Sequence, residues 1–158
     1  MNVALEQLAS TIRLGESRHE RLRLAFAFSC TSRVRHLLEE PEVAKCLVVL
    51  GRFLEGKASR QELDAARADA VRLAGSHPGS VSIDGCGHAA VSASYAVARA
   101  LEAKALESAS YAAYATVYAQ GGAAAVADRA AFEPEFCWQL ASLTALAECT
   151  ADAQGLIP

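Results

Sequence analysis

Apolar residues recur at helical spacing along most of the chain. Between residues 42 and 55 the apolar side is formed by Val43, Cys46, Leu50 and Leu54. A spacing of three or four positions is typical of an amphipathic helix with one buried face. Similar patterns predict further helices over residues 2–13, 17–40, 59–75, 86–103 and 105–120, a short one to about 129, and a last one over 134–151.

No segment shows the two-residue alternation of a half-buried strand over a sufficient length. The apolar run at 81–83 is too short to predict one. Short connections favour antiparallel neighbours in a helical bundle. We therefore predict an all-α fold, with residues 1–158 forming one domain of about seven helices joined by short loops.

Two Ser-x-x-Glu sequences have the form of a capping box. They begin at Ser17 and Ser59, with Glu20 and Glu62 three residues later. In this motif each side chain accepts a hydrogen bond from a backbone N–H that the first helical turn leaves free. The sequence therefore predicts helix starts at both serines.

Glycine and proline predict the other helix boundaries. Pro41 should end the second helix, and Gly56 and Gly75 should end the two that follow. The glycine pair 121–122 should interrupt a later helix, and Pro134 should occupy the first turn of the last one. In that last helix the apolar positions predict one buried side, formed by Phe136, Leu140, Leu143 and Leu146.

The clearest loop is SHPGSVSIDG, residues 76–85, which divides the chain into two helical halves. Asp84 is placed to cap the helix that follows it. Residues 153–158 show no helical pattern, and we expect a loose tail there.

The net charge is −3, and the two halves of the chain differ. Residues 1–75 carry 12 basic and 10 acidic residues, whereas residues 76–158 carry 3 and 8, so their net charges are +2 and −5. This balance argues against a nucleic-acid partner bound by simple electrostatic attraction. The acidic side chains expected on exposed surface are Asp128, Glu133, Glu135, Glu148 and Asp152.

The proportion of apolar residues, 53%, is too high for a disordered chain. Polar residues nevertheless interrupt every stretch of the length needed to cross a membrane, about 18 residues. The N-terminus lacks the basic start and apolar segment of a signal peptide. We expect a cytoplasmic protein with no membrane association.

Five cysteines lie far apart, and no two are separated by only two residues. An odd number at wide spacing fits neither a disulfide framework nor a zinc knuckle. We expect reduced thiols, and the apolar neighbours of Cys30, Cys46, Cys137 and Cys149 predict that these four pack as small apolar side chains. The positions are Cys30, Cys46, Cys86, Cys137 and Cys149.

The stretch GCGHAAVSASYAVARA, residues 85–100, places Cys86 two residues before His88 at a predicted helix start. A thiol there can have a lowered pKa, and a histidine can assist a nucleophile. However, side chains two apart on a helix point away from each other. A metal site would need further ligands at a recognisable spacing. We therefore interpret the pair as structural and predict no catalytic residue, metal or cofactor.

Two polar stripes follow on neighbouring predicted helices. His88, Ser92, Tyr95 and Arg99 share one helix face, which is either a polar pocket that includes Cys86 or a buried hydrogen-bonded stripe. On the next helix the stripe is Tyr111, Tyr114 and Tyr118. Tyrosines at this spacing either pack in the core or contribute to a binding surface.

Alanine dominates the same region, with 19 alanines between Ala89 and Ala131. Small side chains let helix axes approach closely. The sequence leaves open whether this close packing is internal or between subunits of a homo-oligomer.

Basic residues gather at Arg18, Arg21, Arg23, Arg33 and Arg35. They could form an anion site. Glutamates interspersed among them favour a mixed, solvated surface instead.

Three stretches together resemble a family of immunity proteins from bacterial polymorphic toxin systems. They are FAFSCTSRVRHLLEE at 26–40, LGRFLEGKASRQELDAARADAVRLA at 50–74 and GCGHAAVSASYAVARALEAKALESASYAAYA at 85–115. The family features match Cys30, Gly56, Ser59 and the Gly-His-Ala-Ala run 87–90. Two parts of the sequence depart from the family. Residues 34–36 include an arginine and a histidine where the family is apolar, and residues 132–158 have no counterpart in the family. The resemblance implies an all-α protein that binds and neutralises a cognate toxin, without enzymatic activity.

These observations give three functional hypotheses. In the first, the acidic second half binds a basic toxin surface, with contacts from Asp128, Glu133, Glu135 and the tyrosine stripe. In the second, a small enzyme or ligand-binding domain uses the face of His88 and Tyr95. In the third, the Ala-rich helices form a structural homo-oligomer.

Overall fold

The computed structural model describes residues 2–79 and 86–155, and these two ranges are almost entirely helical. The described residues contain no strand, so the all-α prediction is confirmed. The α-helices are α1 (Val3–Thr11), α2 (Glu20–Arg33), α3 (Pro41–Leu54), α4 (Arg60–Ser76), α5 (Cys86–Leu101), α6 (Ala105–Ala125) and α7 (Glu133–Gly155). Short 3-10 helices lie at η1 (Ser17–His19), η2 (Arg35–Leu37) and η3 (Arg129–Phe132).

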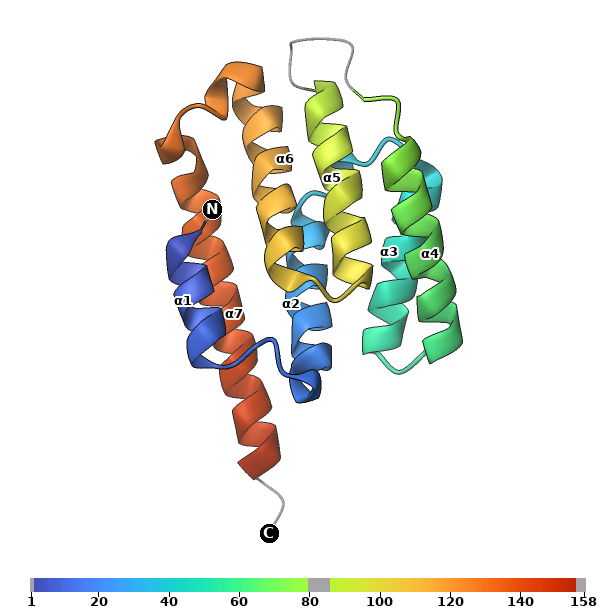
Figure 1. Ribbon diagram of the computed structural model, residues 1–158, viewed down its shortest axis with the longest axis vertical. Helices are drawn as coiled ribbons and strands as arrows, with labels where there is room; N and C mark the ends of the chain where they lie inside the picture. Colours follow the sequence, from blue (N-terminus) through green and yellow to red (C-terminus); the bar gives the residue numbers. More distant parts are fainter. Residues whose placement is uncertain (1, 80–85, 156–158) are drawn as a thin grey trace.

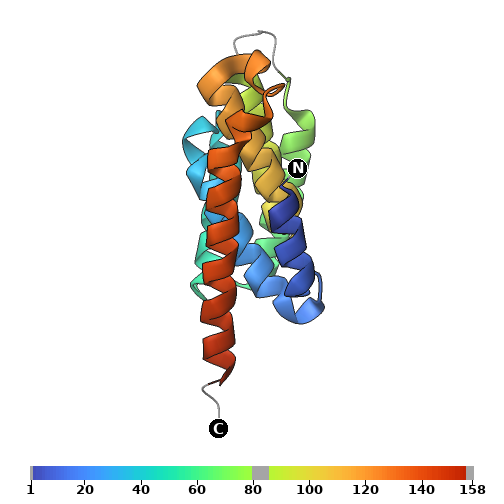
Figure 2. The same cartoon turned by 90° about the vertical axis from the view of Figure 1, so that its left-hand side faces the viewer.

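The antiparallel pair α5 and α6 forms the centre of the bundle (Figure 1). Helix α2 packs against both of them, the hairpin of α3 and α4 lies on one side, and α1 and α7 lie on the other. One hydrophobic cluster contains buried residues from all seven helices. The far end of α7 extends beyond the rest of the bundle (Figure 2).

Small side chains allow α5 and α6 to pack closely. Ala96, Ala109 and Ala112 are fully buried. The hydroxyl of Ser108, also fully buried, donates to the backbone carbonyl of Ala96 at 2.9 Å across the two helices. The alanines therefore serve contacts inside the chain, and a homo-oligomer stays a prediction with no surface assigned to it.

The predicted helix over 17–40 is wrong at its start. Residues Ser17–His19 form a 3-10 turn, and no side-chain hydrogen bond caps α2. The carboxylate of Glu20 instead accepts two hydrogen bonds from Arg60, each at 2.9 Å, and this contact lowers the pKa of Glu20. The capping box does not form here, because Ser17 lies in the 3-10 turn and the carboxylate of Glu20 pairs with Arg60 of α4.

The same helix also ends earlier than predicted, at Arg33. Val34 leaves helical geometry, and the chain is extended again at Leu38 and Glu40. A residue that precedes proline avoids helical backbone angles, which accounts for the extended Glu40. Pro41 then occupies the first turn of α3.

The second capping box is confirmed. The Ser59 hydroxyl accepts from the backbone N–H of Glu62 at 3.2 Å, and Glu62 accepts from that of Ser59 at 2.7 Å. This hydrogen bond from the Ser59 backbone lowers the pKa of Glu62.

Replacing Ser59 with alanine should lower the free energy of unfolding by about 1 kcal/mol, because a backbone donor of α4 loses its acceptor. The matched control is Ser17→Ala, which removes no cap and should cost less than about 0.5 kcal/mol. Urea unfolding followed by circular dichroism measures both. Equal losses in the two variants would contradict the assignment of the cap.

The remaining boundaries follow the sequence in part. Gly56 ends α3 with φ +74°, and Gly122, with φ +68°, interrupts α6, as predicted. Gly75 does not end α4, which continues to Ser76. Helix α7 reaches Gly155, so the expected tail is helical that far. The loop prediction is confirmed for residues 77–79. Residues 80–85, which include the predicted cap Asp84, and residues 156–158 of the predicted tail lie outside the described residues.

Candidate functional site

The polar stripe of α5 packs directly on the tyrosine stripe of α6. The ring of His88 stacks on Tyr118 with centroids 5.0 Å apart, and the ring of Tyr95 stacks on Tyr111 at 5.3 Å. From His88 to Tyr95 the chain advances along α5 by as many residues as it goes back along α6 from Tyr118 to Tyr111, as expected for two antiparallel helices. These rings therefore hold the central hairpin together, which supports the packing interpretation of both stripes.

The predicted pocket residues do not converge on one point. Arg99 forms ion pairs with Glu102 at 2.7 Å and with Glu107 at 3.1 Å, whereas Cys86 is exposed at the start of α5. Ser92 is buried between the two ends of the stripe. Among the described residues, no three His, Cys, Asp or Glu side chains gather closely enough to hold a metal ion.

Four of the five clustered arginines have partners within the described parts of the chain. Arg18 pairs with Glu16, and Arg23 donates to the carbonyls of Leu14 and Glu16. Arg21 donates to the carbonyl of Leu54, and Arg33 pairs with the carboxylate of Glu135 on α7. Because these partners lie in the connection after α1, at the end of α3 and on α7, the arginines support the mixed-surface interpretation.

A groove of about 550 Å³ opens where α1, α6, η3 and α7 meet, and we call it the α7 groove. Its floor holds the rings of Tyr114, Phe132 and Phe136, and Arg129 and Glu133 lie among its lining residues. Tyr114 meets Phe132 edge-on at 5.1 Å, and Phe132 meets Phe136 at 5.5 Å. The remaining lining comes from residues 2–4 and from Val126, Cys137 and Leu140.

Local sequence signals build the walls of the α7 groove. After the break at Gly122, the Asp128 carboxylate accepts from the backbone N–H of Ala130 at 2.9 Å and starts η3, which leads directly into α7. On the opposite wall, Asn2 caps α1 by accepting from the N–H of Leu5. Its side-chain amide also donates to the carbonyl of Phe136 at 3.0 Å, which ties α1 to α7.

Two of the six predicted contact residues line this groove. They are Tyr114, which is 39% exposed, and the exposed Glu133. Asp128 is exposed at the start of η3. Tyr111 and Tyr118 are half-buried against the rings of α5.

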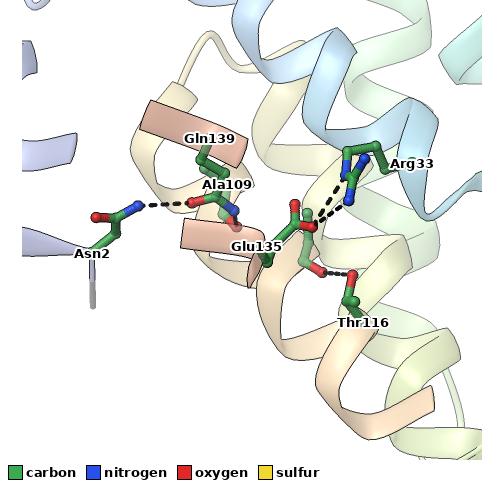
Figure 3. Close-up of polar contacts among 7 residues, drawn as sticks. Asn2, Arg33, Ala109, Thr116, Glu135 and Gln139 are labelled. Atoms are coloured by element: carbon green, nitrogen blue, oxygen red, sulfur yellow. Dashed lines mark hydrogen bonds and ion pairs between the residues drawn. The ribbon is translucent and has the colours of Figure 1, made fainter. Parts of the chain in front are cut away.

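The prediction that Glu135 lies on exposed surface is wrong. Its side chain is 2% exposed, and one carboxylate oxygen accepts from Nε and Nη2 of Arg33 at 3.1 and 2.9 Å (Figure 3). The guanidinium of Arg33 also lies 4.2 Å from the ring centre of Trp138. The buried carboxylate of Glu135 therefore joins α7 to α2 through the partly exposed Arg33, because a buried carboxylate requires a charged partner.

The buried face of α7 also differs from the predicted one. Glu135, Gln139 and Leu143 are the most deeply buried residues, whereas Phe136 and Leu140 are only half-buried and line the groove. Gln139 donates to the carbonyl of Ala109 at 2.8 Å, and its other amide atom accepts from Asn2 (Figure 3). Two polar residues on the inner face misled a prediction based on apolar periodicity alone.

The cysteines divide into two groups. Cys30 and Cys46 are buried, and burial raises the pKa of both thiols. Cys86, Cys137 and Cys149 are exposed, so the expectation of a packed thiol is wrong for the two on α7.

Iodoacetamide should therefore modify three cysteines of the native protein and all five after unfolding in urea. The thiolate is the reactive form, and both burial and a raised pKa suppress it. Intact-mass spectrometry counts the adducts. A fourth adduct formed in native buffer at the rate of the first three would contradict the burial of Cys30 and Cys46.

Most of the groove was not predictable from the sequence. Arg129, Phe132 and Cys137 carried no pattern of their own, and Phe136 was assigned to the core. The available signal was the clustering of aromatic residues on both sides of Pro134. Only the fold brings this cluster to Tyr114, which lies in another helix.

Searches against family models, curated proteins and solved structures gave no match to this chain. The resemblance to immunity proteins accordingly remains a prediction. Within the described residues, no helix combines the length and apolar character needed to cross a membrane.

Proposed function

We propose that the protein is a non-enzymatic, immunity-type binding protein that neutralises a cognate bacterial toxin by protein–protein contact. The contact surface in this proposal is the α7 groove together with Asp128. The supporting observation is an open groove with an aromatic floor, in which Tyr114 is 39% exposed and charged residues lie at the edge. Aromatic residues are enriched at the centres of protein interfaces, with polar residues around them.

The acidic residues of this corner suit a basic partner. Asp128 and Glu133 are exposed, and the chain beyond residue 75 has a net charge of −5. Complementary charge raises the rate of association more than the final affinity. A toxin whose active surface is basic, such as a nuclease, fits this description.

The two alternatives receive less support from the geometry. A small enzyme or ligand-binding domain would need His88 and Tyr95 to face a common space, but each ring stacks on a tyrosine of α6. A homo-oligomer through the Ala-rich helices would need alanines that α5 and α6 instead bury against each other.

The test begins with the protein as bait in its native host and mass spectrometry of what it retains. A retained protein with a toxin domain is then expressed alone and together with this chain. Restored growth on co-expression is the expected result. A toxin domain that is retained but stays lethal would overturn the proposal, as would retention of no toxin at all.

The substitution Glu133→Lys should weaken protection, because it replaces an attractive charge at the groove by a repulsive one. We expect the association rate with the toxin to fall by about fivefold at low salt, with little difference at high salt. The matched control is Glu148→Lys, an exposed position on the same helix outside the groove. Surface plasmon resonance gives both rates, and equal rates would place the contact elsewhere. Pairing Glu133 with Glu135 in one double variant would instead test folding, because Glu135 is buried.

A further inference from the structure

The two charges among the groove lining have no partners within the described parts of the chain. Arg129 and Glu133 are both exposed, and neither makes an ion pair or a side-chain hydrogen bond there. Elsewhere, most charged side chains of the bundle are paired, as Arg60 is with Glu20 and Arg99 with Glu102. The α7 groove therefore presents one unpaired positive and one unpaired negative charge beside the same apolar floor.

Packing against the rest of the bundle holds the aromatic residues of the groove in place. Phe132 is 8% exposed and packs with Ala113 and Val117 in a small second hydrophobic cluster beneath the groove. Phe136 packs against that cluster from the start of α7. A prearranged floor lowers the entropy cost of binding, because few side chains must be ordered.

The opening is large enough for one bulky side chain with its flanking backbone. Its volume of about 550 Å³ lies within the range of protein binding pockets, about 300 to 1,000 Å³. The exposed side chain of Val3, at 56%, extends the apolar surface along the edge formed by α1.

We infer that the α7 groove receives a segment of the partner protein in which one large apolar side chain lies between a basic and an acidic residue. The apolar side chain packs on Tyr114, Phe132 and Phe136. The basic residue pairs with Glu133, and the acidic residue pairs with Arg129. This inference rests on the proposed function, since it names the chemistry of the segment that the partner presents.

The α7 groove carries its own reporter, because Cys137 lines it and is exposed. A bound segment should shield this thiol from iodoacetamide. Cys149 is also exposed on α7 but lies outside the groove lining, so its rate is an internal reference. The ratio of the two rates, from peptide mass spectrometry, reports occupancy without a toxin.

The probes are capped peptides with a central tryptophan and charged residues two positions away on each side. Alternate residues of an extended chain face the same side, so all three can meet the groove. Four peptides differ only in the two flanking residues, which are Lys and Glu, two Lys, two Glu or two Gln. A fifth peptide keeps Lys and Glu but has alanine in place of tryptophan. With millimolar peptide, we expect the Lys–Glu peptide to slow modification of Cys137 about threefold more than the Gln peptide does.

Two variants should then reverse the preference. In Glu133→Arg both groove charges are positive, so the peptide with two Glu should protect Cys137 best. In Arg129→Glu both are negative, so the peptide with two Lys should protect best. Both substitutions are on exposed side chains, and circular dichroism confirms that each variant keeps its helical content.

Three outcomes would overturn the inference. They are an unchanged ratio with every peptide, equal protection by all four tryptophan peptides, and equal protection by free tryptophan, which would make the groove a small-molecule site. None of these outcomes requires a toxin, so the inference can fail while co-expression still restores growth. Equally, the peptides can bind as expected while the search for a toxin partner fails.

Discussion

Replacing Arg33 with methionine should lower the free energy of unfolding by about 3 kcal/mol. The carboxylate of Glu135 is 2% exposed and receives two hydrogen bonds from this one guanidinium. Its second oxygen already has no hydrogen-bond partner among the described residues. Arg33 itself is 41% exposed, but the carboxylate it pairs with is not, so without Arg33 a buried charge would lose its partner. That loss is more costly than the loss of an ion pair in which both members are exposed. Urea unfolding measured by circular dichroism gives the difference.

The matched control is Arg60→Met, which removes the pair with Glu20 on the surface. Both members of that pair are about half exposed, at 51% and 41%, so the expected loss is below about 1 kcal/mol. The double variant Arg33→Met/Glu135→Met should regain most of the stability lost in the single variant, because no buried charge remains. A single variant as stable as the control would show that water reaches Glu135.

The second large effect is expected from Ala96→Leu, which should cost about 3 kcal/mol. Ala96 is fully buried on α5, and its carbonyl accepts the hydrogen bond from Ser108 of α6. A leucine there has no space unless the two helices separate, and separation would also lengthen that hydrogen bond. Thermal and urea unfolding should both report the loss.

Ala119→Leu provides the comparison, because Ala119 is an exposed alanine on α6. Alanine and leucine have similar helix propensities, so this change should stay within about 0.5 kcal/mol. If both leucine variants were equally stable, α5 and α6 would not be packed as closely as described.

Helix content was predictable because it depends on residues close in sequence. The spacing of Val43, Cys46 and Leu50 predicted α3 almost to its ends, and Ser59 and Gly56 predicted the boundaries beside it. Prediction failed where a distant residue competed for a local signal. Glu20 belongs to the pattern of a capping box, but Arg60 binds it from 40 positions away.

The candidate site was predictable only in fragments. Tyr114 and Glu133 were singled out because a tyrosine stripe and an acidic second half are visible in the sequence. Glu135 was assigned to the same acidic surface. It lies only two positions after the exposed Glu133, but on a helix this is enough to turn its side chain towards the interior. Which side of α7 faces inward depends on how α1, α2 and α6 surround it, and no local pattern encodes that.

By itself the sequence determined an all-α chain, most helix boundaries and the small side chains that let α5 and α6 pack closely. Those features follow from hydrogen bonding within a turn and from apolar spacing along one helix. Only the tertiary structure decided that Glu135 and Gln139 face the interior, and that Tyr114, Phe132 and Glu133 share one groove. These outcomes depend on contacts between segments far apart in the chain. A polar side chain can be buried there because a distant partner replaces the hydrogen bonds that it would otherwise make to water.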